Sequence, residues 1–402
     1  FKMVDWDNLL SYKTVKIISI RDKRLGLLHY FFMFLIFVYV VGYTIVWQKR
    51  YLITASPIGS IRLSLKEPDT RPPPSNLTYC LDNSTYSSAF DSFHKKKLQC
   101  RYWDAPLVLY PGMESSSMFI STRVNIEYEY LYNNVTGQNC SAEMLSPDCK
   151  YIPSKEDPLI ETYIADPERF TIMIDHAVYA PRVGIQRDGT SLDGYIKGPD
   201  GEKMEVPHTD HQRVGEPGVA DIISVATMLK AAGVDDLDAE SDYISPKNDS
   251  HRESFRYAGA VFVVYMVYSN TETYDLYDVQ YYYQVTRLKK TEFKSVQPIL
   301  TKNIDKRKLY NRHGVRLIFQ QVGNLGKFDF QTLLLSFVSG LGLLAAATFV
   351  VDLLALYLFP QKKIYRAYKY LQTKEILSST TEEDLANIRR GEQLPLIGEE
   401  RS

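Results

Sequence analysis

Two long apolar runs, one near each end, dominate the hydrophobic pattern of this chain. They extend from Leu25 to Trp47 and from Phe330 to Phe359, and the long segment between them is mostly polar. A helix needs about 20 residues to cross a hydrocarbon core of about 30 Å, so each run is long enough to span a membrane. The pattern predicts a two-pass membrane protein with both termini on one side and the middle segment on the other.

Basic residues flank both runs on the sides that face the termini. Lys23 and Arg24 precede the first run and Lys362 and Lys363 follow the second, whereas Lys49 and Arg50 are a smaller signal in the opposite sense. The positive-inside rule therefore places both termini in the cytoplasm. We expect a cytoplasmic N-terminus (1–24), a first transmembrane helix (25–47), an extracellular or luminal domain (48–329), a second transmembrane helix (330–359) and a cytoplasmic tail (360–402).

The middle segment carries the marks of an oxidising, glycosylating compartment. All four cysteines lie in it, and we favour the two short-range disulfides, Cys80 with Cys100 and Cys140 with Cys149, over the other pairings or over unpaired buried thiols. The Asn-x-Ser/Thr glycosylation acceptors lie there too, at Asn76, Asn83, Asn134, Asn139 and Asn248.

The same segment is rich in β-strand patterns. Val, Ile, Phe, Tyr and Thr recur with alternating polarity in five stretches: 117–130, 170–179, 258–268, 274–288 and 315–322. One exception is Val219 to Ala232, whose apolar spacing and following Gly233 predict an amphipathic helix. The fold class that follows is two transmembrane helices flanking a large β-rich domain.

Signals of enzyme or nucleic-acid chemistry are absent from the sequence. It contains no His-Glu-x-x-His, Gly-x-Ser-x-Gly, phosphate-binding Gly-rich loop or Cys-x-x-Cys motif, so we assign no catalytic residue and no cofactor. His208, Asp210 and His211 are better explained as loop polarity than as metal ligands, so we assign no metal site. A net charge of -1 gives no general attraction to nucleic acid.

The second apolar run differs from the first in its small residues. Ser336, Ser339, Gly340 and Gly342 allow close helix contact or a narrow passage. Asp352 is a carboxylate in the inner half of the membrane, which costs about 2.5 to 3.5 kcal/mol unless it meets water or a partner. We favour a place beside an ion path over simple helix pairing. Two helices cannot enclose a pore, so a channel requires several subunits.

The motifs resemble those of the ionotropic purinoceptors, the trimeric ATP-gated cation channels. The similarity is strongest from Gly314 to Lys369, with Gly326-Lys327-Phe328-Asp329, Ser339-Gly340-Leu341 and Asp352-Leu353-Leu354 in the family's order. Thr14 and Lys16 match its N-terminal Thr-x-Lys/Arg element, and Tyr365 and Lys369 match its Tyr-x-x-x-Lys motif. The resemblance implies a non-selective homotrimeric channel, embedded in lipid, that passes Na⁺, K⁺ and Ca²⁺.

The resemblance also implies a binding site for ATP, as agonist rather than cofactor, between two subunits. Lys66 takes the place of the second phosphate-binding lysine, Thr171 that of the adenine-contacting threonine, and Met173 that of the apolar contact two residues later. Several positions depart from the family: Ser64 replaces the first lysine, Tyr282-Tyr283-Gln284 stand in for an Asn-Phe-Arg triplet, and Asn311 replaces a further lysine. Arg287 and Arg312 are candidates to supply the missing charge.

Leu335, Ser339 and Gly342 share one helical face and match the family's pore constriction. Two alternatives remain at this stage: an accessory subunit of a lipid-flipping ATPase, and a channel of this fold opened by a non-nucleotide ligand. The tail motif Glu392-Gln393-Leu394-Pro395-Leu396-Ile397 has an acidic-dileucine pattern. It predicts a protein in the plasma membrane, in endosomal or vacuolar membranes, or in both.

Overall fold

The computed structural model describes residues 23–81, 88–90, 96–112, 114, 116–141, 147–206, 211–243, 253–360 and 362–363. Contacts between Cα atoms divide the chain into two compact units. One contains the helices from both ends of the chain, and the other contains residues Ile53–Phe328. We describe each unit by itself.

The β-rich unit is built around β17, a strand of 23 residues that extends from Lys306 to Phe328. β17 pairs antiparallel with β5 (Ser117–Asn133) and parallel with β14 (Ala260–Ser269), and β14 pairs with β15 (Gln280–Arg287). A β-bulge interrupts the pairing of β17 with β5 at Gly314, where a Cβ atom would lie 2.0 Å from the carbonyl oxygen of Ile120. Glycine is therefore required at this close approach.

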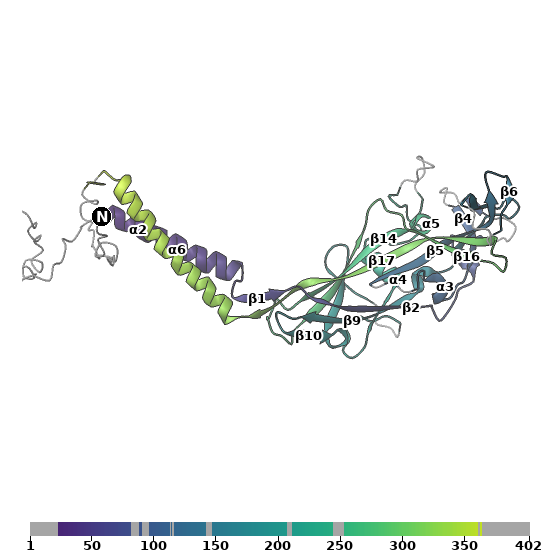
Figure 1. The fold of residues 1–402 in the computed structure, drawn as a ribbon. Helices are drawn as coiled ribbons and strands as arrows, with labels where there is room; N and C mark the ends of the chain where they lie inside the picture. The colour runs from purple at the N-terminus through teal and green to yellow at the C-terminus, as the bar shows by residue number, and fades with distance from the viewer. Residues whose placement is uncertain are drawn as a thin grey trace, which may run out of the picture. The chain divides into compact units, whose positions relative to one another are not determined.

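The other strands of the large sheet extend it on both sides of β17 (Figure 1). They are β1 (Leu52–Ala55), β3 (Ser88–Phe90), β4 (Lys96–Arg101), β6 (Gln138–Asn139), β7 (Cys149–Pro153), β8 (Ile160–Ile164), β11 (Asp193–Lys197), β12 (Lys203–Met204) and β16 (Lys294–Leu300). β16 pairs with β17, and β4 pairs with β8.

In a smaller sheet, β10 and β13 pair with different segments of one edge of β9, and β2 pairs along its other edge. Its strands are β2 (Ile58–Lys66), β9 (Thr171–Ala180), β10 (Ile185–Asp188) and β13 (Asp221–Ser224). Along β9 the side chains of Ile172 and Ile174 point into the core, whereas those of Thr171 and Met173 are only half-buried. One hydrophobic core contains residues of both sheets.

Polar contacts also join the two sheets. Asp221 of β13 accepts hydrogen bonds of 2.6 Å from the hydroxyls of Tyr281 and Tyr283 on β15. Burial, followed by the charge of Asp221, raises the pKa of both tyrosines, so they remain protonated donors. Gln321 of β17 donates to the carbonyl oxygen of Ala177 on β9. The smaller sheet is therefore fixed against β15 and β17 of the large sheet.

Two disulfides and several short helices complete this unit. The disulfides pair Cys80 with Cys100 and Cys140 with Cys149, which confirms the predicted pairing. The short helices are α3 (Ala105–Val108), α4 (Val225–Ala231) and α5 (Phe255–Ala258), with 3-10 turns η2 (Pro74–Asn76), η3 (Pro167–Arg169) and η4 (Gly189–Ser191).

The expected helix from Val219 to Ala232 is wrong in its first half. Asp221–Ser224 forms β13, which pairs antiparallel with β9, and helix α4 begins only at Val225. Sheet pairing takes precedence there because Ile223 is buried between the strands, and Ser224 then caps α4 by accepting from the backbone N–H of Thr227. The expected strand 274–288 is also shorter, because β15 begins at Gln280.

The helical unit contains α2 (Lys23–Phe37), its continuation as the π-helix η1 (Val38–Trp47), and α6 (Phe330–Tyr357). Both helical segments are long and apolar enough to cross a membrane. Asp329 caps α6 by accepting from the backbone N–H of Thr332 at 2.9 Å. Gly340 of α6 lies against Val40, where a Cβ atom would be 2.8 Å from a methyl carbon of the valine.

Candidate ligand pocket and apolar helices

A pocket of about 420 Å³ lies in the β-rich unit where β2 ends and β9 begins. Thr171 is the first residue of β9 and Lys66 the last of β2, and the sheet register pairs them directly. On the other side of β9, Thr171 pairs with Ser224 of β13. The pocket is lined by these three residues and by Glu67, Pro68, Asp69, Thr70, Glu168, Arg169, His211, Gln212 and Ala226.

Directly paired residues of an antiparallel sheet lie on the same face. Lys66 and Thr171 therefore share a face, as do Ser64 and Met173 one step further along. The side chain of Lys66 is 65% exposed. The structure thus places Lys66 and Thr171 at one pocket, whereas Met173 is on the same face of the sheet but does not line the pocket.

A glutamine fixes the far wall of this pocket. The side-chain oxygen of Gln212 accepts from the backbone N–H of Ser224 at 3.2 Å and from the hydroxyl of Thr227 at 2.7 Å. These bonds hold the β13–α4 corner in place beside Thr171. Sequence reasoning did not single out Gln212, because nothing local to it indicates that it spans two elements.

Asp69 is the lining carboxylate that contacts Lys66 and His211. One of its oxygens lies 3.2 Å from Nζ of Lys66, and the other lies 3.5 Å from Nδ1 of His211. Glu67, in contrast, is held by Arg71 at 3.5 Å and accepts from the backbone N–H of Ala105 at 3.0 Å. The sequence analysis considered His208, Asp210 and His211 together and assigned no metal site to them. The structure describes His211, whereas His208 and Asp210 lie outside the described residues.

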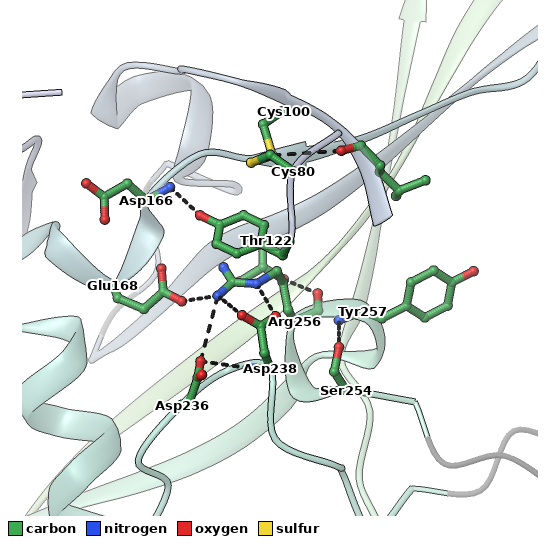
Figure 2. A network of polar contacts seen from close by, with 12 residues as sticks. Cys80, Cys100, Thr122, Asp166, Glu168, Asp236, Asp238, Ser254, Arg256 and Tyr257 are labelled. Carbon is green, nitrogen blue, oxygen red and sulfur yellow. Dashed lines mark hydrogen bonds and ion pairs between the residues drawn. A yellow bond between two sulfur atoms is a disulfide. The ribbon is translucent and has the colours of Figure 1, made fainter. Parts of the chain in front are cut away.

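Glu168 is tied to a buried arginine behind the pocket (Figure 2). The guanidinium of Arg256 donates to Glu168 and also to both carboxylate oxygens of Asp238, at 2.7 and 3.0 Å. Arg256 is 1% exposed and lies 3.5 Å above the ring of Tyr79. Burial opposes its charge, but the carboxylates of Glu168 and Asp238 outweigh that effect and raise the pKa of Arg256, which stays charged.

The two arginines that the sequence analysis considered as substitutes are both engaged within their own chain. Arg312 is 4% exposed, donates to the carbonyl oxygen of Leu107 at 2.7 Å and to Gln297 at 2.8 Å, and lies among the rings of Trp103, Tyr110 and Tyr310. Arg287 pairs with Asp242 at 2.5 Å and is partly buried. Neither lines the pocket around Lys66.

The strand beside Asn311 is β16 rather than β15. β15 is separated from β17 by β14, and Tyr283 is buried with its hydroxyl on Asp221. In β16, Val296 pairs with Asn311 and the exposed Lys294 pairs with His313. The sequence analysis did not consider Phe293 and Lys294, at the start of β16, as candidate site residues. An aromatic residue followed by a cation was the signal that could have identified them.

Helix α6 has two different faces in the helical unit. Gly340, Ala347, Val351 and Ala355 are buried, and Leu25 of α2 belongs to the same small apolar cluster as the last two. Leu335, Ser339 and Gly342 are exposed within the chain, with Leu335 at 67%. The small residues therefore occur on both faces, with Gly340 on the buried face and Ser339 and Gly342 on the exposed face.

Several predicted residues lie on the surface or outside the described part. Asn76, Asn134 and Asn139 are exposed, as a glycosylation site requires, whereas Asn83 and Asn248 are outside the described residues. The motif residues Thr14, Lys16, Tyr365 and Lys369 and the acidic-dileucine pattern also lie outside the described residues. Asp352 is half-buried on α6.

The comparisons with known proteins agree with this architecture. The family described as "ATP P2X receptor" matches residues 10–151 and 278–372. P2X receptor E of Dictyostelium discoideum is 43% identical over 370 residues, covering 92% of this chain and 89% of that protein. P2X receptor A of the same organism is 40% identical and covers 92% of each. A crystal structure of the Gulf Coast tick P2X receptor, obtained with ATP and Zn²⁺, covers 82% of this chain and all of that one, at 18% identity and a TM-score of 0.50.

Two membrane-length apolar helices that flank a β-rich domain are the architecture of a P2X-type channel subunit, the fold of the tick structure matched above. The chain belongs to the P2X receptor family, whose members are ATP-gated cation channels and not enzymes. It is accordingly an integral membrane protein, and the resemblance stated from the sequence is confirmed. The accessory-subunit alternative is not favoured.

Proposed function

We propose that ATP opens this channel by binding between subunits, with the pocket around Lys66 and Thr171 as one half of the site. The observation that supports this most is the paired position of these two residues at the pocket, with Met173 on the same face. An exposed ammonium group and a hydroxyl on adjacent strands suit a phosphate chain and a polar base edge.

The other half of the site comes from the neighbouring subunit in this proposal. Lys294 is the best candidate cation there, because it is exposed and lies on the strand that pairs with Asn311. Arg287 contributes only by exchanging its contact with Asp242 for a phosphate. The guanidinium of Arg312 is buried, so Arg312 acts indirectly, by fixing β16 to β17 through its hydrogen bond to Gln297.

In the membrane, we propose that three α6 helices line the pore of a homotrimer. Leu335, Ser339 and Gly342 would form the narrow part, because they occupy the α6 face that is exposed within one chain. Na⁺, K⁺ and Ca²⁺ would pass along this face near Asp352. Exposed aromatic residues of α2, such as Phe31 and Phe34, would meet lipid. The membrane is the plasma membrane, an endosomal or vacuolar membrane, or both.

Replacing Lys66 tests the site directly. Lys66→Ala removes a charge-assisted contact of about 1.5 to 3 kcal/mol, which corresponds to a rise of roughly 10-fold to 150-fold in the ATP midpoint. The measurement is the dose-response curve of ATP-evoked cation current. The exposed Lys203, which lies outside the pocket, provides the control Lys203→Ala. An unchanged midpoint in Lys66→Ala would contradict this site.

A non-nucleotide agonist is the second candidate. It is favoured by Ser64 and Asn311, which stand where the resemblance expects lysines. A cation current that responds to other ligands but to no nucleotide would select it.

A further inference from the structure

An arginine that no sequence motif singled out lies in the pocket. Arg169 ends the 3-10 turn η3, two residues before Thr171, and its side chain is 47% exposed. Its Nη2 donates to the hydroxyl of Thr70 at 2.8 Å, and its Nη1 donates to Asp166 at 3.2 Å. The guanidinium thus joins the loop after β2 to the turn before β9. A guanidinium has five N–H donors, so these two contacts leave capacity for a bound anion.

The turn that carries Arg169 is fixed from inside the domain. The hydroxyl of Tyr79 accepts from the backbone N–H of Asp166 at 2.8 Å, and Arg256 holds Glu168 (Figure 2). The ring of Tyr79 in turn packs against the guanidinium of Arg256. Asp166 itself has a left-handed backbone conformation, with φ of 57°. Because buried groups hold the turn on both sides, Arg169 is presented to the pocket with little freedom left to lose on binding.

The charge balance of the pocket also favours an anion. Three carboxylates line it, but Glu168 is neutralised by Arg256 and Glu67 by Arg71, both from outside the pocket. Asp69 is the lining carboxylate that remains, and it pairs with Lys66. Arg169 is paired with Asp166, which does not line the pocket. One lining carboxylate therefore opposes the two cations Lys66 and Arg169. A phosphate that displaced Asp69 would meet both cations.

We propose that Arg169 is a second phosphate-binding cation of this pocket, acting with Lys66. This inference rests on the proposed function. Ser64 stands where the resemblance expects a first lysine, and it pairs with Met173 further along β9, whereas Lys66 pairs with Thr171. Arg169 therefore supplies a positive charge on the side of Lys66 opposite to Ser64. The phosphate chain would therefore extend from Lys66 toward Thr70 and Arg169. The bidentate fork of an arginine suits this contact better than an ammonium group does.

The test compares Arg169→Ala, Arg169→Lys and Arg169→Glu with Lys66→Ala in the full-length channel. ATP-evoked current and displacement of bound ATP are both measured, after size-exclusion chromatography has shown that each variant assembles like the wild type. We expect Arg169→Ala to raise the ATP midpoint about 10-fold or more, Arg169→Lys to recover part of the loss, and Arg169→Glu to be the weakest binder. The exposed Arg182, which lies outside the pocket, gives the matched control Arg182→Ala, with a change within about twofold.

The outcomes separate this inference from the proposed function. If Lys66→Ala weakens ATP binding and none of the Arg169 variants does, the pocket stands and the role of Arg169 is wrong. If Ala, Lys and Glu at position 169 weaken binding equally, Arg169 has only a structural role, and the inference is again overturned. If neither Lys66→Ala nor Arg169→Ala has an effect, the proposed site itself fails.

Discussion

His313 is the buried residue through which acid should act most directly on the stability of the β-rich unit. Burial, followed by the charges of Arg123 and Lys294, lowers its pKa to about 3. Its Nδ1 atom has no hydrogen-bond partner in the described part of the chain. An unfolded chain binds a proton at this histidine below about pH 6.5, whereas the folded protein does not do so until about pH 3. Stability is therefore present above pH 6.5 and is lost as the pH falls from there toward 3.

We predict that His313→Gln makes stability less dependent on pH. One unit of pH in this window is worth about 1.4 kcal/mol for one group, so His313 should contribute about 2 kcal/mol to the loss between pH 6.5 and pH 5. The measurement is the thermal unfolding midpoint of the detergent-solubilised channel at pH 7 and pH 5. His211→Gln serves as the control, because His211 is exposed. An equal drop in wild type and His313→Gln would contradict the assignment.

At the residue scale, the sequence predicted the pocket but not its charge balance. Lys66 and Thr171 were expected to lie together, and strand pairing places them so. Arg312 was expected to be an available cation, yet three aromatic rings from distant segments surround it. The contacts that hold Glu168 to Arg256 join residues far apart in the chain. No local pattern shows such contacts, because they depend on which strands pair.

At the element scale, the hydrophobic pattern located the helices and most strands but not every boundary. The alternation of polarity in 170–179 corresponds to β9, because one face of β9 is on the core. The stretch 117–130 corresponds to β5, which is buried on both faces from residue 118 to residue 124 and alternates only after that. The stretch 219–232 was predicted as one helix, but its apolar residues fit the period of a strand as well as that of a helix. The pairing of β13 with β9 decides that its first half is a strand. The π-helical geometry of η1 has no signal in the sequence that we identify.

The two glycines of α6 offer a matched test of its two faces. A Cβ atom at Gly340 would lie 2.8 Å from Val40, whereas one at Gly342 would have no neighbour within 4 Å in the chain. We predict that Gly340→Ala lowers the unfolding midpoint, because overpacking typically costs about 1 to 3 kcal/mol, and that Gly342→Ala does not. Adding Val40→Ala to Gly340→Ala should restore stability, as a double-mutant cycle would show. Equal effects of the two single substitutions would mean that α6 does not pack on Val40 in the membrane.

At the scale of the whole molecule, members of this family are trimers. The pocket described here lies where β2 ends and β9 begins, so each chain carries one copy of it. In the site that we propose between subunits, Lys66 belongs to the first half and Lys294 of β16 to the second. Three linked subunits then form three such sites, each with one half from each of two chains. The arrangement of two substitutions among the linked chains therefore decides how many sites remain intact.

We predict that the order of substitutions in a linked trimer changes the ATP response. Lys66→Ala is placed in the first chain, and Lys294→Ala either in the second chain or in the third. A shared site takes its second half from the same neighbour at every position around the ring. One of the two arrangements therefore puts both substitutions in the same site, and the other damages two sites. The two orders should therefore differ in ATP-evoked current. A site contained within one chain would leave one intact site in both orders. Linked trimers with each single substitution confirm beforehand that both residues affect the midpoint, and identical responses of the two orders would rule out binding between subunits.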